Sequence, residues 1–126
     1  MPLYNPGIAI ATESTTVLQN AAGSPGNGTA LTLDSGVETV DLTIADTAGT
    51  ATVVVEVDEG SGYVTALVTE MVAGALALLS GSLALTGNTR RVLFRRSENL
   101  KAVSLRARIS AVVGGMVTVT AITRRR

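Results

Sequence analysis

The segment from Thr50 to Asp58 alternates between two kinds of side chain with a period of two residues. One face of this segment would carry Ala51, Val53, Val55 and Val57. The opposite face would carry Thr52, Val54, Glu56 and Asp58. Because successive side chains of a β-strand point to opposite faces, the pattern predicts a half-buried strand. The same rhythm recurs in segments 37–44, 103–110 and 117–121, and it predicts that Val92 and Phe94 face inward together.

Short loops of strand-breaking residues separate these segments. They are Gly23–Gly28, Glu59–Gly62 and Gly114–Gly115. About eight short strands with turn signals every ~8–12 residues indicate an all-β fold, an antiparallel β-sandwich of the jelly-roll or immunoglobulin-like kind. Residues 1–14 contain Pro2, Pro6 and Gly7, which prevent a helix there. We therefore predict an extended N-terminal arm over residues 1–14 and a single β-sandwich domain over residues 15–126.

The longest apolar run, Met71 to Leu85, is harder to assign. Its Ala and Leu content would suit a short helix over residues 71–79, whereas Gly74 and the surrounding strands favour a strand. The run is shorter than the roughly 18–20 residues that a membrane-spanning helix needs. Since the chain contains only two tyrosines and one phenylalanine as aromatic residues, aliphatic side chains must fill its core. We therefore interpret the run as buried core.

The side chains that most often carry catalysis are missing from this chain. It contains neither histidine nor cysteine, which removes the commonest general base, thiol nucleophiles and thiolate metal sites. Asp58 and Glu59 could act as paired carboxylates or, with Ser61, ligate calcium. A solvated hairpin loop is the simpler interpretation of these acidic residues. We expect no enzymatic activity and no cofactor.

Charge is divided sharply along the chain. All ten basic residues lie at or after Arg90, and nine of the ten acidic residues lie before it. Residues 1–89 therefore carry a formal charge of −9 and residues 90–126 carry +9, although the whole chain is neutral. A compact fold must either interleave the two portions within one subunit or pair them between subunits. The sequence leaves both arrangements open.

Arginine makes up nearly all of the basic residues. Its clusters are Arg90–Arg91, Arg95–Arg96, Arg106 with Arg108, and Arg124–Arg126. Arginine suits bidentate pairing with carboxylates at protein interfaces, whereas binding of single-stranded nucleic acid would need stacking aromatic residues, and only Phe94 lies in these clusters. The clusters therefore favour a protein interface, with ordinary exposed strand faces and nucleic-acid binding as alternatives. Because Arg91 and Arg95 lie an even number of positions apart along a strand, we expect both on the same face. The candidate interface residues are Tyr4, Asp58, Glu59, Arg90, Arg91, Arg95, Arg96, Arg124, Arg125 and Arg126.

Four segments together resemble small β-sandwich proteins of tailed bacteriophage virions. They are Leu18–Ala22, Gly26–Leu31, Gly49–Val57 with the Asp58 loop and Tyr63, and Leu105–Arg108 followed by Gly114–Val119. In such proteins a strand of this kind often runs into a Ser-x-Asp-Gly hairpin, where this chain has Val57-Asp58-Glu59-Gly60. The resemblance spans roughly residues 15–123 and implies a structural role in the virion.

Within that role the resemblance does not distinguish a capsid protein from a neck or tail component, and we favour a capsid decoration or cement protein, which bridges and stabilises shell subunits. A head–tail or tail adaptor is the alternative within the same class, and a carbohydrate- or receptor-binding module is the alternative from another class. The implied partners are the major capsid protein or other virion subunits, within a homo-oligomer for which we favour a trimer; we expect no nucleic-acid or membrane partner. The implied location is the capsid surface after synthesis in the host cytoplasm, since the N-terminus lacks the pattern of a secretory signal.

Overall fold

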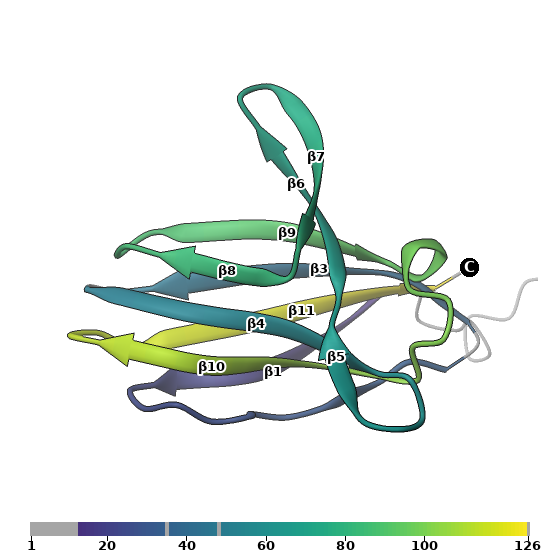
Figure 1. Cartoon of the computed structure of the whole chain (residues 1–126), viewed down its shortest axis with the longest axis horizontal. Helices are drawn as coiled ribbons and strands as arrows, with labels where there is room; N and C mark the ends of the chain where they lie inside the picture. The colour runs from purple at the N-terminus through teal and green to yellow at the C-terminus, as the bar shows by residue number, and fades with distance from the viewer. Residues whose placement is uncertain (1–12, 35, 48, 126) are drawn as a thin grey trace, which may run out of the picture.

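The computed structural model describes residues 13–34, 36–47 and 49–125, and it consists of two antiparallel β-sheets around one hydrophobic core (Figure 1). This architecture confirms the predicted all-β antiparallel sandwich. The described part also contains a short 3₁₀ turn, η2 (Arg96–Glu98). The strands are β1 (Glu13–Ala22), β2 (Leu31–Thr32), β3 (Val37–Asp46), β4 (Thr50–Asp58), β5 (Tyr63–Thr65), β6 (Leu67–Val72), β7 (Ala75–Ser80), β8 (Ser82–Leu85), β9 (Thr89–Arg95), β10 (Ser104–Val113) and β11 (Val117–Arg125).

The strand order places late segments of the chain beside early ones. The six-stranded sheet has the order β1-β11-β3-β9-β6-β7, and the five-stranded sheet has the order β2-β10-β4-β5 with β8 also on β4. Because β10 pairs with β4 along its whole length, β5 and β8 share the other edge of β4. The basic strands β9, β10 and β11 are therefore each hydrogen-bonded to an acidic strand, β3 or β4.

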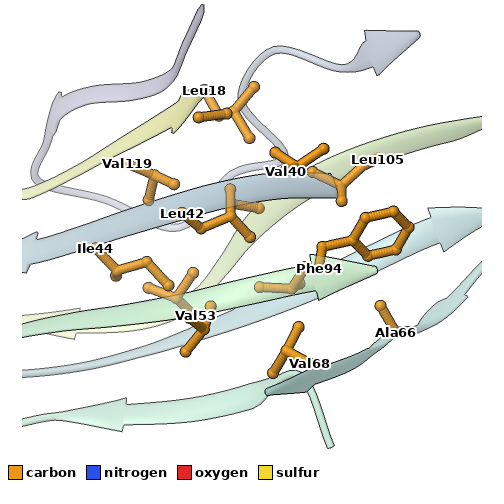
Figure 2. Close-up of a cluster of buried hydrophobic side chains, with 14 of the residues drawn as sticks. Leu18, Val40, Leu42, Ile44, Val53, Ala66, Val68, Phe94, Leu105 and Val119 are labelled. Carbon is orange, nitrogen blue, oxygen red and sulfur yellow. The ribbon is translucent and has the colours of Figure 1, made fainter. Parts of the chain in front are cut away.

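The core follows the alternation that the sequence predicts. Val53, Val55 and Val57 of β4 are buried, and Val92 and Phe94 of β9 face inward together as expected. Figure 2 shows how side chains from the two sheets meet in a single cluster. Phe94 is the largest fully buried side chain, and the other members are aliphatic. An aliphatic core of this kind accounts for the abundance of valine in the strands.

The predicted N-terminal arm lies mostly outside the described residues, which begin at Glu13. In the described part, Glu13 and Ser14 already belong to β1, where they pair with Arg124 and Thr123 of β11. The strand therefore includes two residues that the sequence analysis assigned to the arm. The ion pair between Glu13 and Arg124 gives Glu13 a partner that strand periodicity does not reveal.

The interpretation of residues 71–85 as buried core is wrong for the first half of that run. Residues 71–79 form no helix; they lie in the β6–β7 hairpin, which turns at Ala73 and Gly74 and stands away from the body of the sandwich (Figure 1). Met71 is 61% exposed and Leu76 is 63% exposed. The reason is that β6 pairs with β9 only at Val68 and Thr69, so the rest of the hairpin extends past the sheet. Burial resumes with β8, where Leu83 and Leu85 enter the core.

The hairpin leaves and rejoins the sandwich at a backbone junction of three residues. The amide of Ala66 donates to the carbonyl of Val55 (2.9 Å), and the amide of Val55 donates to the carbonyl of Gly81 (2.8 Å). The amide of Gly81 in turn donates to the carbonyl of Ala66 (2.8 Å). The chain is thus divided at Ala66, with β5 in one sheet and β6 in the other. A Cβ atom on Gly81 would lie 2.7 Å from the Val55 carbonyl oxygen, so the junction requires glycine at this position.

We expect Gly81→Ala to lower the free energy of unfolding by about 1–3 kcal/mol, because the added methyl group overpacks against backbone that cannot move independently. Gly26→Ala is the matched control, since a Cβ atom there meets nothing within 4 Å. Urea denaturation of both variants measures the effect. Equal unfolding midpoints for Gly81→Ala and the control would contradict the described junction.

Candidate interaction surface

The outer face of the five-stranded sheet carries a compensated charge cluster. Glu56 of β4 accepts from Arg106 (2.9 Å) and pairs with Arg108 (3.2 Å), both on β10. The Arg106 guanidinium also lies 3.8 Å from the centroid of the Tyr63 ring, in a cation–π contact. The Tyr63 hydroxyl is hydrogen-bonded to the Ser104 hydroxyl (2.9 Å). Tyr63 is therefore engaged with its own subunit, which argues against its use as a stacking platform for sugars.

The C-terminal arginines pair with acidic residues of the same subunit. Arg124 donates to Asp41 and to Glu13, each at 2.8 Å, and these hydrogen bonds raise the pKa of Arg124. Arg125 donates to Asp34 (2.6 Å) and, with help from the Gly36 amide, holds the pKa of Asp34 below its ordinary value. Such exposed pairs add little net stability, but they do neutralise the charges that the sequence separates.

Arg90 binds the β6–β7 hairpin to the end of β9. Its guanidinium forms two hydrogen bonds with the Glu70 carboxylate and a third with the Ala84 carbonyl (3.1 Å). The hydrogen bonds between Arg90 and Glu70 lower the pKa of Glu70 and raise that of Arg90. Arg96 is also engaged, since it donates to the backbone carbonyls of Asp34 (2.9 Å) and Val37 (3.5 Å). Of the predicted interface residues, Arg90, Arg96, Arg124 and Arg125 thus have partners within the subunit.

Arg91 and Arg95 differ from these four arginines in their surroundings. Both lie on the outer face of β9, on either side of Leu93, and pair in register with Thr43 and Thr39 of β3. Neither forms an ion pair within the described part of the chain. The strand alternation therefore places two cations without a carboxylate partner on one face, as their parity predicts. Arg95 also lines a shallow cleft of about 480 Å³ beside the exposed Leu100.

The acidic hairpin loop that the sequence singles out has a structural role. One carboxylate oxygen of Asp58 accepts from the amides of Gly60 (2.8 Å) and Gly62 (3.3 Å), which closes the turn between β4 and β5. Glu59 is exposed in the same turn. Across residues 13–34, 36–47 and 49–125, no group of three or more acidic side chains could hold a metal ion, and no helix is long and apolar enough to cross a membrane. Tyr4 and Arg126 lie outside the described residues.

The surface that sequence reasoning missed is the apolar face of the β6–β7 hairpin. Met71 and Leu76 are paired across the hairpin, and Leu78, which is 56% exposed, lies on the same face. Since Thr69 is opposite both Leu78 and Leu93, this face continues the outer face that carries Arg91 and Arg95. The available signals were Gly74, which marks a turn, and leucines at two-residue spacing in β7.

The Asn99 side chain holds the base of this hairpin by bonding both backbone groups of Leu67, as a residue of a neighbouring strand would. Its side-chain oxygen accepts from the Leu67 amide (3.0 Å), and its amide nitrogen donates to the carbonyls of Leu67 and Arg95 (both 3.1 Å). The Thr69 hydroxyl makes a longer contact with Glu98 (3.4 Å). These bonds fix the direction in which the hairpin leaves the sheet.

Comparison with known proteins gives the fold. No family model matches the sequence, and no curated protein matches it. The crystal structure of the SPBc2 prophage-derived protein YomS is similar at a TM-score of 0.71 and 19% identity, over 94% of this chain and 98% of YomS. The crystal structure of the PBSX exported protein XepA is similar at a TM-score of 0.71 and 16% identity, over 98% of this chain and 45% of XepA. The chain spans less than half the length of XepA, and its likeness to both structures is one of fold.

We expect Glu70→Gln to lower the free energy of unfolding at neutral pH by about 1.5–3 kcal/mol, because it weakens a charged hydrogen-bonded pair that is mostly shielded from water. The pKa of Glu70 is lowered in the folded state from its ordinary value of 4.5. Its stabilising contribution is therefore fully present above that value and is lost as the pH falls through the folded-state pKa. Urea unfolding at neutral and acidic pH should show the difference from the unsubstituted protein shrinking on acidification.

The exposed loop substitution Glu59→Gln serves as the control for this experiment. It should leave the unfolding free energy nearly unchanged at both pH values. A Glu70→Gln effect that persists undiminished after acidification would contradict the role of the ionised carboxylate.

Proposed function

We propose that this chain is a non-enzymatic structural protein of a bacteriophage particle, a decoration or cement protein that binds the capsid surface and bridges neighbouring shell subunits. The four segments that resemble virion proteins support a phage origin. The fold shared with YomS, which is described as an SPBc2 prophage-derived protein, is consistent with the same class. The absence of histidine and cysteine from the sequence supports a mechanical role rather than a catalytic one.

The ion pairs within the subunit support a role as a rigid body whose charges are largely neutralised before it binds a partner. Five arginines form ion pairs with acidic residues of the same subunit: Arg90, Arg106, Arg108, Arg124 and Arg125. Most of the segregated charge is thus used within the fold. Of the two arrangements left open by the sequence, compensation inside one subunit is the one observed for these residues.

The observation that carries the proposal is the outer face of the six-stranded sheet. It combines Arg91 and Arg95, which lack carboxylate partners in the described part, with the exposed apolar residues Met71, Leu76 and Leu78. Protein interfaces combine apolar contacts with arginine in this way, and contiguous exposed apolar residues mark such surfaces. A shell subunit that presents carboxylates around an apolar patch would fit this face.

We expect Arg91→Ala/Arg95→Ala to weaken binding to capsids of the same phage by about 10-fold or more, because each substitution would leave a desolvated carboxylate of the shell subunit without its arginine. Binding of the unsubstituted protein should also weaken with salt, since ionic strength screens the pairs. Co-sedimentation with capsids over a salt series measures both effects. Lys101→Ala, which removes an exposed cation beside the 3₁₀ turn, is the control.

Equal binding by the double variant and the control would contradict docking through this face. Binding to isolated tails or to the neck, with none to capsids, would replace the decoration role with the adaptor alternative. Failure to bind any part of the particle would contradict the proposed function as a whole.

A further inference from the structure

The six-stranded sheet ends at β7, whose outer edge is open. β7 is the last strand of the six-stranded sheet and pairs on one side only, with β6. Its six residues, Ala-Leu-Ala-Leu-Leu-Ser, contain no charge and no proline, and their register with β6 has no shift. A flat, uncharged, apolar edge offers unpaired backbone groups to another strand, and proteins normally block such edges.

The other strands at the ends of the two sheets, and β8 beside β5, are distorted or short. β1 carries Glu13 and two register shifts that distort its ladder. β2 is two residues long, β5 is three and β8 is four, which is too short to template a stable pairing. Among these strands, β7 is the long and regular one with an open edge, and Figure 1 shows its hairpin standing clear of the body, where a second strand can approach.

The hydrogen-bonding groups that face outward on β7 can be identified from its turn. Ala73 and Gly74 both have positive φ, at 50° and 83°, and form a two-residue hairpin turn between the paired residues Val72 and Ala75. In such a hairpin the pair that flanks the turn is hydrogen-bonded, and the pairs alternate from there. The backbone groups of Ala75, Ala77 and Leu79 therefore face β6, and those of Leu76 and Leu78 face the open edge.

We propose that β7 pairs with β7 of a second copy of this chain, antiparallel and about a two-fold axis at Ala77. Leu76 then lies opposite Leu78 of the second copy, and the two residues exchange both backbone hydrogen bonds, as the closely spaced pairs of an antiparallel ladder do. The two six-stranded sheets become one continuous sheet. This pairing yields a dimer, in place of the trimer favoured from the sequence, and it goes beyond the proposed function and does not depend on it.

The side chains of β7 favour a second copy over a strand of another kind. Leu76 and Leu78 point to the same face as Met71, so the leucines of the two copies would form cross-strand apolar pairs on the outer face. Glu70, the hairpin's one charged residue, is held by Arg90 on the opposite face. A charged partner strand would find no counter-charge on β7, whereas an identical uncharged strand meets no repulsion. The chain as a whole carries no net charge, so two copies also approach without net repulsion.

Sedimentation velocity from about 1 to about 100 µM tests the pairing, because a reversible dimer shifts with concentration. The mass should rise from 12.8 kDa to twice that value.

Leu76→Lys/Leu78→Lys and Leu76→Glu/Leu78→Glu should each raise the dimer Kd by about 100-fold or more, since each places like charges opposite one another. Mixing the two variants should restore a dimer, because the proposed register sets every introduced lysine against an introduced glutamate. Leu100→Lys/Val113→Lys, at two other exposed apolar positions, should dimerise like the unsubstituted chain.

Hydrogen exchange gives a second readout that packing of apolar faces alone would not produce. The amides of Leu76 and Leu78 should become protected as concentration rises, while that of Ala77, already facing β6, should change little. A monomer throughout the concentration range, an oligomer unaffected by the leucine substitutions, or a failure of the mixed variants to associate would each overturn the proposal. A monomeric chain that still binds capsids would overturn the dimer and leave the proposed function standing. A dimer that binds no part of the particle would support the dimer and overturn the proposed function.

Discussion

The position of the β6–β7 hairpin depends on the three-way backbone junction of Val55, Ala66 and Gly81. Two strands, β5 and β8, pair with consecutive stretches of the same edge of β4. The chain between them forms β6 and β7, which belong to the other sheet. The junction satisfies the amides of all three residues where an interrupted edge would otherwise leave them buried without partners. Because Gly81 carries no side chain, the outgoing and returning strands can approach closely enough to close it. Asn99 and the Arg90–Glu70 pair then set the direction of the hairpin from the side of β9.

The charge division along the chain is resolved by strand order. Antiparallel pairing places β10 beside β4 and sets β9 and β11 on either side of β3, so the basic C-terminal strands meet acidic partners from the first half. Glu56 and Asp41 each face arginine across such a pairing. Arg91 and Arg95 remain outside this compensation within the described part of the chain. Arg91 and Arg95 pair in register with threonines, and they lie on the face to which the hairpin adds its exposed leucines.

Sequence periodicity predicted the parts of this fold that depend on local alternation. The inward faces of β4 and β9 follow directly from residues such as Val55 and Phe94, and so does the shared outer face of Arg91 and Arg95. It failed for Met71 and Leu76, because composition reports hydrophobicity but not whether another element covers it; that depends on the extent of β6–β9 pairing. The ion pairs could not be assigned for a similar reason. Which carboxylate meets Arg124 is decided by strand order, and strand order is a long-range property that a single sequence does not encode in its spacing.

The β6–β7 hairpin exposes an apolar surface outside the core, and we propose that this surface is covered when the protein binds a particle. Carbene footprinting of the dilute protein and of the protein bound to particles tests this most directly. We expect strong labelling of Met71, Leu76 and Leu78 in the dilute subunit and loss of that labelling on particles. Labelling of these three residues that is weak from the start, or that persists unchanged on particles, would contradict it.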